Sequence, residues 1–463
     1  MKRGNRLSAV VFAAGKGTRM HSPLPKVLQP LLGEPMLRYA LSALDPLCPG
    51  RVHTLVGYRA DLVRGAFPER EGLFIVQEDQ LGTGHALTTA WEALRGNPPE
   101  YLLVVNGDTP LPDGSIPAGF VEESMRERRD LSFISLTLPD TGAFGLVLRR
   151  DGRVTGIVEA GDFSEAVHGP KSGEINTGIY CIRTETIAPL LPLLGRDNAR
   201  GEVYITDLVA LAAARGLSVE GRNFGNDPRL AGVNTPAELS KAEEYLRASI
   251  VERHMERGVL IRAPHSVRIG PAVRIEPGAD LTGPCEIYGR SSIGAGARIA
   301  SHCRLQDVVL EQDAELRSFC HVEHAAVGRG CAVGPYARLR PGSVLEEGAH
   351  VGNFVELKKA RLGKGAKAGH LSYLGDAEVG DRANIGAGAI TCNYDGVNKH
   401  RTRIGAGAFI GSNAALVAPV DIGDGALIGA GSVITKNVPA DNLGVGRAPQ
   451  RSLPLRAPGA KKS

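Results

Sequence analysis

Residues 1–235 alternate between short apolar runs and longer stretches in which apolar residues recur at helical spacing. The apolar runs, each of strand length, are 7–14, 52–57, 73–77, 101–106, 131–138 and 178–183. Helical spacing is clearest in 84–95 and 117–129. Strands that alternate with helices predict an α/β domain with a mainly parallel sheet, in which ligands bind at the carboxyl ends of the strands.

A second pattern begins after Leu260, where an aliphatic residue recurs every six positions. Its first members are Ile269, Ile275, Leu281, Ile287, Ile293, Ile299 and Leu305. The period continues, with interruptions, to Ile434, and a small residue usually follows the aliphatic one. This hexapeptide repeat predicts a left-handed parallel β-helix, in which three six-residue sides form one coil and the aliphatic side chains point inward.

Four steps of five residues interrupt this period. They are Leu305 to Leu310, Val322 to Val327, Leu357 to Leu362 and Leu374 to Val379. Successive steps lie 17 or 35 residues apart, which corresponds to one or two coils. The spacing therefore predicts that all four steps fall on one corner of the prism.

One longer interruption predicts a loop that projects from the β-helix. From Thr391 to Ile404 the chain runs 13 residues, seven more than one side needs. A loop that leaves a regular solenoid is a candidate binding element. Elsewhere Cys285, Cys303 and Cys320 take the small inward position on successive coils, which favours buried structural thiols over a redox or metal site.

The two patterns are separated by a predicted helix. Thr235 can cap it, Pro236 suits its first turn, and Glu238 completes a capping box. We expect this charged helix to extend to about residue 257. The resulting organisation is a domain at 1–235, a linker helix at 236–260, a β-helix at 261–446 and a basic, Pro-rich tail at 447–463.

Composition narrows the class of protein. The 463 residues include 54 Lys and Arg and 50 Asp and Glu, a formal charge of +4, which argues against a nucleic-acid or membrane-surface partner. No apolar run is long enough to span a membrane. The seven Cys are widely spaced, as expected for reduced thiols in the cytoplasm. The apolar run near the N-terminus ends at a glycine-rich segment and is interpreted as a buried strand, since no signal-peptide cleavage site follows it.

A first candidate site begins at the glycine-rich segment 15–20, directly after the first predicted strand. Glycines let backbone N–H groups approach phosphate oxygens, and Lys16 and Arg19 supply positive charge. Its spacing matches neither a P-loop nor a dinucleotide-binding fingerprint, so a plain tight turn remains an alternative. At the end of a later strand, Asp108 is placed to hold Mg²⁺ or, alternatively, to form an ordinary turn.

Several further motifs carry a family resemblance. The segment AAGKGTRM is followed by SPLPK at 22–26, QLGTGHA at 80–86, EINTG at 174–178 and GVN at 232–234. Together they resemble the sugar-1-phosphate nucleotidyltransferases, which implies a Rossmann-like N-terminal domain. With the β-helix included, residues 7–450 resemble the bifunctional N-acetylglucosamine-1-phosphate uridyltransferase/glucosamine-1-phosphate acetyltransferase family.

The resemblance implies the contents of the first site. Arg19 and Lys26 would be catalytic and face the triphosphate of UTP, and Asp108 and Asn234 would hold Mg²⁺. The nucleotide and its sugar would be bound by Phe12, Ala13, Ala14, Gly15, Lys26, Gln77, Gly82, Thr83, Asn106, Gly107, Asp108, Gly145, Glu159, Asn176 and Asn234. Two positions depart from the family pattern: Asn106, where some members have Tyr, and Leu146, where Arg is frequent.

Charged residues that the hexapeptide repeat does not require indicate a second candidate site. Arg340, Lys358, His370 and Tyr373 are close enough in sequence for neighbouring coils to bring them together. A cationic pair suits a sugar phosphate, and His370 is a candidate general base, although a lone His in a repeat is more often structural. Glu356 is a candidate for orienting His370.

The resemblance also implies the contents of the second site. His370 would be the base, and Arg340, Lys358, Tyr373 and Asn384 would bind the acceptor sugar phosphate. Acetyl-CoA would be bound by Ala387, Asn393, Tyr394, Ser412, Ala430 and Arg447, with Asn393 and Tyr394 also reaching the sugar. The family's β-helices pack as homotrimers with this site at the subunit junctions.

The implied function is bifunctional. Glucosamine-1-phosphate would be acetylated with acetyl-CoA, and its product would react with UTP to give UDP-N-acetylglucosamine for bacterial cell-wall, peptidoglycan and lipopolysaccharide synthesis. One alternative is a single-activity nucleotidyltransferase whose β-helix only oligomerises. Another is a non-catalytic regulatory subunit. The intact motif residues of both sites argue against these alternatives.

Overall fold

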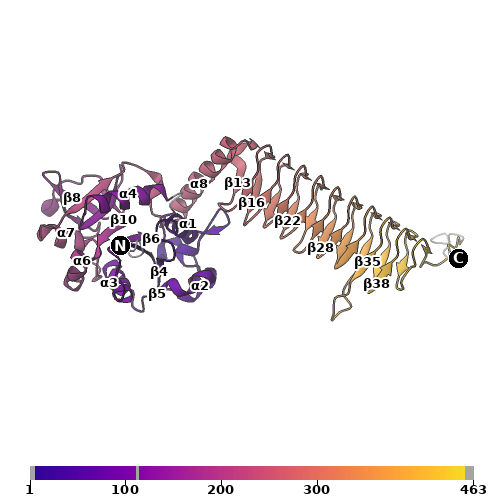
Figure 1. Ribbon diagram of the computed structural model, residues 1–463, viewed down its shortest axis with the longest axis horizontal. Coiled ribbons are helices and arrows are strands. Elements are labelled where there is room, and N and C mark those ends of the chain that lie inside the picture. The colour runs from indigo at the N-terminus through magenta and orange to yellow at the C-terminus, as the bar shows by residue number, and fades with distance from the viewer. Residues whose placement is uncertain (1–5, 111–113, 454–463) are drawn as a thin grey trace, which may run out of the picture. The chain divides into compact units, whose positions relative to one another are not determined.

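Two units make up the chain, Met1–Leu246 and Arg247–Ser463 (Figure 1). The computed structural model describes residues 6–110 and 114–453. The division falls within α8 (Pro236–Glu256), the helix expected from the capping pattern. The Glu238 carboxylate accepts the backbone N–H of Thr235 at 3.0 Å, and Thr235 Oγ1 accepts that of Glu238 at 3.2 Å. The assignment of this helix as a linker stays a prediction.

The first unit is built on a nine-stranded sheet whose main path is β11-β7-β10-β6-β1-β4-β5. Its strands are β1 (Leu7–Ala13), β4 (Val52–Val56), β5 (Phe74–Val76), β6 (Tyr101–Asn106), β7 (Leu131–Thr137), β8 (Leu146–Arg150), β9 (Arg153–Val158), β10 (Glu174–Arg183) and β11 (Val219–Asn223). The pairs β1–β4, β1–β6, β4–β5 and β7–β11 are parallel, which confirms the predicted α/β class.

Strand β10 departs from the parallel arrangement, because it is antiparallel to both β6 and β7. The connection that precedes it contains the β8–β9 hairpin and the short helix α5 (Glu165–His168) instead of a long crossover helix. The apolar pattern predicts a strand here but carries no information on its direction. Gly178 interrupts the register with φ of 81°, and a Cβ there would lie 2.0 Å from Asn106 Nδ2.

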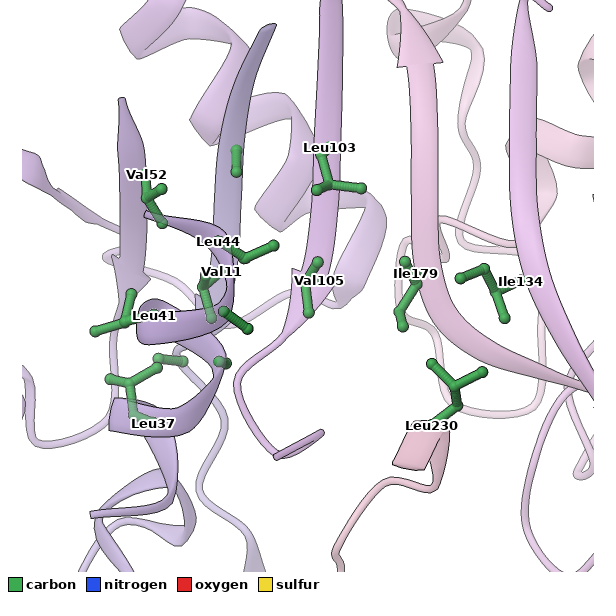
Figure 2. Close-up of a cluster of buried hydrophobic side chains, with 14 of the residues drawn as sticks. Val11, Leu37, Leu41, Leu44, Val52, Leu103, Val105, Ile134, Ile179 and Leu230 are labelled. Atoms are coloured by element: carbon green, nitrogen blue, oxygen red, sulfur yellow. The ribbon is translucent and has the colours of Figure 1, made fainter. Parts of the chain in front are cut away.

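Helices cover both faces of this sheet, because successive residues of its strands point to opposite sides. Val11 of β1 belongs to the core that includes α1 (Met36–Leu44), α2 (Ala60–Ala66) and α4 (Ser115–Arg126). Its neighbour Val10 belongs to the core that includes α3 (Thr83–Leu94) and α7 (Asp207–Ala214). Figure 2 shows Leu37, Leu41 and Leu44 of α1 beside strand residues of the first core.

Smaller elements complete the first unit. They are the hairpin β2 (Pro30–Leu31) and β3 (Glu34–Pro35), helix α6 (Thr184–Ile187), and the 3₁₀ turns Thr18–Met20, Lys26–Leu28, Pro68–Leu73, Ala188–Leu193 and Pro228–Leu230. Among the described residues of the whole chain, no helix is both long and apolar enough to cross a membrane.

The second unit is a left-handed parallel β-helix with three faces, as the repeat predicts (Figure 1). The first face contains β12 (Leu260–Arg262), β15 (Asp280–Thr282), β18 (Arg298–Ile299), β21 (Glu315–Leu316), β24 (Ala332–Val333), β27 (His350–Asn353), β30 (Lys367–His370), β33 (Asn384–Ile385), β36 (Phe409–Ile410), β39 (Leu427–Ile428) and β41 (Leu443–Gly444). Each strand pairs with the equivalent strand of the next coil.

The other two faces follow the same rule. The second contains β13 (Val267–Ile269), β16 (Cys285–Tyr288), β19 (Arg304–Gln306), β22 (His321–Glu323), β25 (Arg338–Leu339), β28 (Glu356–Lys358), β31 (Tyr373–Gly375), β34 (Ile390–Cys392), β37 (Ala415–Val417) and β40 (Val433–Ile434). The third contains β14 (Arg274–Ile275), β17 (Ser292–Ile293), β20 (Val309–Leu310), β23 (Ala326–Val327), β26 (Val344–Leu345), β29 (Arg361–Leu362), β32 (Ala377–Val379), β35 (Thr402–Ile404) and β38 (Val420–Ile422).

The four five-residue steps occupy one corner, as predicted. Each runs from a strand of the second face to a strand of the third. At each of these corners one residue takes a left-handed backbone conformation, with φ between 43° and 52°: Asp307, His324, Lys359 and Asp376.

The repeat aliphatic residues form the core of the prism, and Leu281, Leu305 and Leu357 are completely buried. Cys303 and Cys320 are also buried as free thiols, in agreement with their predicted inward position. The predicted loop leaves the solenoid between β34 and β35 (Figure 1). Part of the predicted tail, 454–463, lies outside the described residues.

Candidate active sites

A cleft of about 540 Å³ lies at the carboxyl ends of β1 and β6 in the first unit. It brings together sequence-predicted residues from widely separated segments: Phe12, Arg19, Thr83, Asn106, Asp108, Gly145, Glu159, Asn176 and Asn234. This position is where parallel sheets bind ligands.

One end of the cleft concentrates charge. Lys26 forms an ion pair with Asp108, and its Nζ donates to Asn234 Oδ1 at 2.9 Å. Arg19 Nη2 donates to the same Oδ1 at 2.9 Å. The Lys26 and Asp108 side chains are only 15% and 16% exposed, so solvent screens their attraction less than at the surface. Two cationic side chains and the side-chain oxygens of Asp108 and Asn234 therefore lie together at this end of the cleft.

The glycine-rich segment makes this convergence sterically feasible. Gly17 has φ of 62°, and a Cβ there would lie 2.5 Å from Lys26 Cβ. A larger residue would be strained and would displace Lys26. Gly15 has no such neighbour within 4 Å, so its backbone is open to a ligand.

The oxygens of Asp108 and Asn234 fit a magnesium site. Both contact the Lys26 ammonium, so they lie close to each other. A Cβ on Gly232 would lie 3.7 Å from Asp108 Oδ1, so glycine keeps this space open. Among the described residues, no group of three or more His, Cys, Asp and Glu forms a metal cage. One carboxylate and one amide oxygen suit Mg²⁺, which takes its remaining ligands from water and substrate phosphates.

The other end of the cleft is polar and partly buried. Thr206 Oγ1 donates to Glu159 Oε1 at 3.0 Å, and Asn176 Nδ2 donates to Tyr180 Oη at 2.7 Å. Burial raises the pKa of Glu159, and the hydrogen bond from Thr206 opposes that rise. A Cβ on Gly145 would lie 3.4 Å from Glu159 Oε1, so glycine leaves room beside the carboxylate.

Sequence reasoning missed Tyr180 and Thr206, which line this end of the cleft. Tyr180 lies within an apolar strand run, and Thr206 precedes helix α7 like an ordinary capping residue. Neither carries a signal that distinguishes it from a structural residue. Only their positions beside Asn176 and Glu159 reveal them.

The remaining predicted nucleotide residues do not line this cleft. They are Ala13, Ala14, Gly15, Lys26, Gln77, Gly82 and Gly107, of which Lys26 contacts the lining residues Asp108 and Asn234. Gln77 Nε2 contacts Gly82 O at 3.4 Å and His85 Nδ1 at 2.9 Å. Gly82 has φ of 114°, and a Cβ there would lie 2.4 Å from Val203 O. This second cluster requires glycine at position 82.

In the second unit, His370 ends β30 directly beside Asn353 of the previous coil. Asn353 Oδ1 lies 2.5 Å from His370 Nδ1. With the amide oxygen as acceptor, Nδ1 carries the proton and Nε2 keeps its lone pair. Glu356, which sequence reasoning put forward for this orienting position, instead accepts a hydrogen bond from Arg340 Nη1 at 3.0 Å.

Cations gather on the second face around Lys358. Lys358 lies beside Lys399 of the projecting loop, and this neighbour, together with Arg340, lowers the pKa of Lys358. Three positive side chains that face one region suit an anionic ligand. Lys399 was missed by sequence reasoning because it lies outside the hexapeptide period and the loop carries no repeat by which to place it.

Tyr373 and Asn393 lie together over a glycine. A Cβ on Gly375 would lie 2.5 Å from Tyr373 Oη and 2.8 Å from Asn393 Nδ2. Asn393 is buried and donates to Asp376 Oδ2 at 2.5 Å. Tyr394 is 60% exposed. The base of the loop is therefore anchored, while Tyr394 extends outward.

The loop carries one further internal contact. His400 Nε2 lies 2.7 Å from Asp395 Oδ2. His400, with the backbone N–H groups of Val397 and Asn398, holds the pKa of Asp395 below its usual range.

The predicted acetyl-CoA residues form a column beyond His370. Ala387, Ser412 and Ala430 each lie two residues after a strand of the first face, on successive coils. Arg447 Nη1 donates to Ala430 O at 2.6 Å and extends the column. Asn384 pairs with Lys367 of the coil that contains His370. The repeat thus places His370 and these residues along one edge.

Three family models match parts of the chain. The MobA-like NTP transferase domain matches 9–136, the GMPPB C-terminal domain matches 269–363, and the bacterial transferase hexapeptide family matches 401–436 as six repeats. The first match lies in the α/β unit, and the other two lie in the β-helix.

Curated relatives match over almost the whole chain. A protein of Nitratidesulfovibrio vulgaris named "Bifunctional protein GlmU" is 59% identical over 448 residues, which cover 97% of this chain and 98% of the relative. Proteins of the same name from Lawsonia intracellularis and Acidithiobacillus ferrooxidans are 44% and 42% identical; they cover 97% and 96% of this chain, and the chain covers 98% and 97% of them. The resemblance inferred from the motifs is confirmed, and the chain belongs to the GlmU family of bifunctional uridyltransferase/acetyltransferases.

Proposed function

We propose that the chain catalyses two reactions of UDP-N-acetylglucosamine synthesis at the two sites described above. The β-helix transfers the acetyl group of acetyl-CoA to glucosamine-1-phosphate, and the α/β unit joins the product to UTP. The observation that carries the proposal is the convergence of Arg19, Lys26, Asp108 and Asn234 at one end of a polar cleft. Family membership carries the pairing of the two activities.

In the uridylyl transfer, a phosphate oxygen of N-acetylglucosamine-1-phosphate attacks the α-phosphorus of UTP. The new P–O bond forms as the bond to the β-phosphate oxygen breaks, and pyrophosphate leaves. Arg19 and Lys26 neutralise charge that grows on the phosphates, which is the main catalytic need in such transfers. Glu159 and Asn176 orient the sugar from the other end of the cleft.

Asp108 and Asn234 would hold Mg²⁺ in this site. The ion supplies further charge neutralisation at the phosphates when bound. Because Lys26 contacts both ligands, its ammonium stays close to the same phosphates and orients them with Arg19.

In the acetyl transfer, the amine of glucosamine-1-phosphate attacks the thioester carbonyl carbon of acetyl-CoA. His370 accepts the amine proton on Nε2, the C–S bond breaks, and the CoA thiolate takes up a proton. Asn353 holds His370 in the required tautomer. Arg340, Lys358 and Lys399 provide positive charge for the sugar phosphate.

The active assembly is a homotrimer. His302, Phe319, Tyr336 and Phe354 stack along the corner that ends at the acetyl-transfer site, with ring centroids 4.6 to 5.2 Å apart. Phe319, Tyr336 and Phe354 are 45% to 55% exposed in one chain, as expected of a surface that packs against another copy. Ser412, Ala430 and Arg447 are also exposed. We expect the mass in light scattering to be three times that of the chain.

The proposed location is the cytoplasm, where UTP and acetyl-CoA are available. The seven cysteines are free thiols, which suits a reducing compartment.

A split assay with purified protein and Mg²⁺ tests both activities. One reaction contains acetyl-CoA and glucosamine-1-phosphate and measures free CoA thiol; the other contains UTP and N-acetylglucosamine-1-phosphate and measures pyrophosphate. We expect His370→Ala to abolish only the first and Lys26→Ala only the second. Pyrophosphate without CoA release in a folded trimer would reduce the β-helix to a scaffold. Full pyrophosphate release by Asp108→Ala would refute the metal assignment.

A further inference from the structure

A cavity in the second unit belongs to neither proposed site. It has a volume of about 670 Å³ and lies between the last turns of α8 and the first coils of the β-helix. It is lined by Ile250, Arg253, His254, Arg257, Pro271, Ala272, Val273, Arg274, Arg290 and Ser292. The residues of the acetyl-transfer site lie several coils further along the chain.

Four arginines line this cavity from two separate elements. Arg253 lies in the last turn of α8 and Arg257 directly follows the end of this helix, whereas Arg274 begins β14 and Arg290 precedes β17. Among the described residues that line the cavity, none is acidic.

Neighbouring arginines of the same coils behave differently. Arg262 pairs with Asp280 at 3.2 Å, and Arg304 pairs with Glu286 at 3.3 Å. These two form the ordinary charge ladder of a β-helix surface. The four cavity arginines have Asp307 near Arg290 but no acidic residue among the described residues of the cavity lining, so the cavity keeps a net excess of positive charge.

The helix dipole accounts for only part of this excess. Arginines in the last turn of a helix are stabilised by its partial negative charge, which applies to Arg253. Arg274 and Arg290 lie on the β-helix, beyond the reach of this dipole, and Arg290 has one carboxylate nearby, Asp307, whose pKa it helps to lower. Four cations that face one space repel each other unless an anion is bound there.

A buried histidine also lines the cavity. His254 lines the cavity and is only 7% exposed. Its Nδ1 is buried and has no hydrogen-bond partner among the described residues. Burial, assisted by Arg253 and Arg257, lowers the pKa of this ring. Because Nδ1 is closed off from the cavity, the arginines and not this ring carry the positive charge that faces a ligand.

We propose that this cavity binds a small anion that carries at least two phosphate groups. Guanidinium groups bind phosphate through paired N–H donors, and four of them can neutralise more charge than one phosphate carries. The volume falls in the range of sites for small metabolites and exceeds what a single phosphate needs. The site goes beyond the proposed function, because neither reaction uses it.

Hydrogen-exchange mass spectrometry of the full chain, with inorganic pyrophosphate as the probe and without divalent cations, tests the proposal. We expect slower exchange in segments 250–258, 271–276 and 289–293. Their positions separate this site from any binding in the nucleotide cleft. The variant Arg257→Gln/Arg290→Gln should raise the pyrophosphate concentration that gives half-maximal protection at least tenfold.

A matched control removes the same charge elsewhere on the β-helix. Arg298→Gln/Arg304→Gln should change the pyrophosphate concentration at half-maximal protection less than twofold. Both double variants should retain both enzyme activities. An equal loss in both variants would show diffuse electrostatic attraction and overturn the proposal. So would unchanged exchange in the three segments at saturating pyrophosphate.

Two further probes identify the source of the phosphates. Equal protection by tripolyphosphate and UTP would support recognition of the phosphate chain alone, whereas tighter binding of UTP would support a nucleotide ligand. Protection by a short RNA but not by pyrophosphate, tripolyphosphate or UTP would overturn the small-anion proposal in favour of a polyanion.

Discussion

At the scale of single residues, the orientation of His370 depends on one amide. Asn353 and His370 are register partners on adjacent coils, so the backbone ladder brings their side chains together. The 2.5 Å contact fixes Nδ1 and leaves Nε2 for the substrate amine. Asn353 is therefore a positioning residue, since it acts through the proposed base.

We predict that Asn353→Ala lowers kcat of acetyl transfer roughly tenfold with little change in KM, because it removes one hydrogen bond to the proposed base without touching the substrate. Steady-state kinetics measure the split. Asn353→Asp, which keeps an acceptor, should restore most of kcat. Asn437→Ala, which removes a distant β-helix hydrogen bond, serves as the control. Equal losses in these three variants would contradict the positioning role.

The buried carboxyl of Glu159, proposed to orient the sugar, makes the stability of the first unit depend on pH. Its buried carboxyl has a raised pKa, so the folded state retains the proton to higher pH than the unfolded state, whose pKa is near 4.5. Its contribution to stability is fully present below pH 4.5 and is lost as the pH rises through the folded-state pKa.

We predict that Glu159→Gln raises the midpoint of thermal unfolding of the first unit at pH 7, and that the difference from wild type shrinks toward pH 4.5. The same change should reduce kcat/KM of uridylyl transfer about 10- to 100-fold, because it removes a charged acceptor for the sugar. Scanning fluorimetry across pH and pyrophosphate assays measure the two effects. Glu165→Gln, on the surface, should show no pH-dependent difference; a constant difference for Glu159→Gln would refute the argument.

At the scale of elements, the shortened corners of the β-helix carry a conformational cost. Each contains one non-glycine residue in the left-handed region, including Lys359 with φ of 46°. This conformation costs L-residues about 1–2 kcal/mol and is least favourable for β-branched side chains. The structure accepts the cost at every shortened coil because the inward aliphatic residues stay in register.

We predict that Lys359→Val destabilises the β-helix by about 1–2 kcal/mol, whereas Lys359→Asn has little effect because Asn tolerates this backbone region. Lys367→Val removes the same charge from an exposed strand position of β30, where a β-branched residue is favoured, and is the matched control. Thermal unfolding followed by far-UV circular dichroism measures all three. A similar loss for both Val variants would contradict a conformational origin.

At the scale of the whole molecule, the two proposed sites differ in how complete they are in one chain. The cleft of the first unit draws its charged and polar residues from a single chain. The residues proposed for acetyl-CoA are exposed along one edge of the β-helix, next to the stacked aromatic corner. A neighbouring copy would complete that edge.

We predict that dilution lowers acetyl transfer per chain but leaves uridylyl transfer unchanged, because only the first depends on subunit contacts. Activity measured over a range of protein concentrations, with light scattering, tests this expectation. Phe319→Asp introduces charge into the aromatic corner two coils from Asn353. The subunits should then separate more readily, so acetyl transfer per chain should begin to fall at a higher protein concentration than in the wild type. Acetyl transfer that stays constant while the trimer dissociates would contradict the shared site.

The sequence by itself determined the α/β unit, the β-helix and the corner of its short steps, because burial imposes a period on apolar residues in strands, helices and coils. It also put forward Arg19, Asp108 and His370 as candidates because their residue types suit the proposed chemistry, and the family resemblance added Lys26 and Asn234. Only the tertiary structure decided the antiparallel direction of β10, the pairing of Asn353 rather than Glu356 with His370, and the approach of Lys399 to Lys358. Strand direction and side-chain pairing depend on register between segments, and a one-dimensional pattern of apolar positions carries no such information.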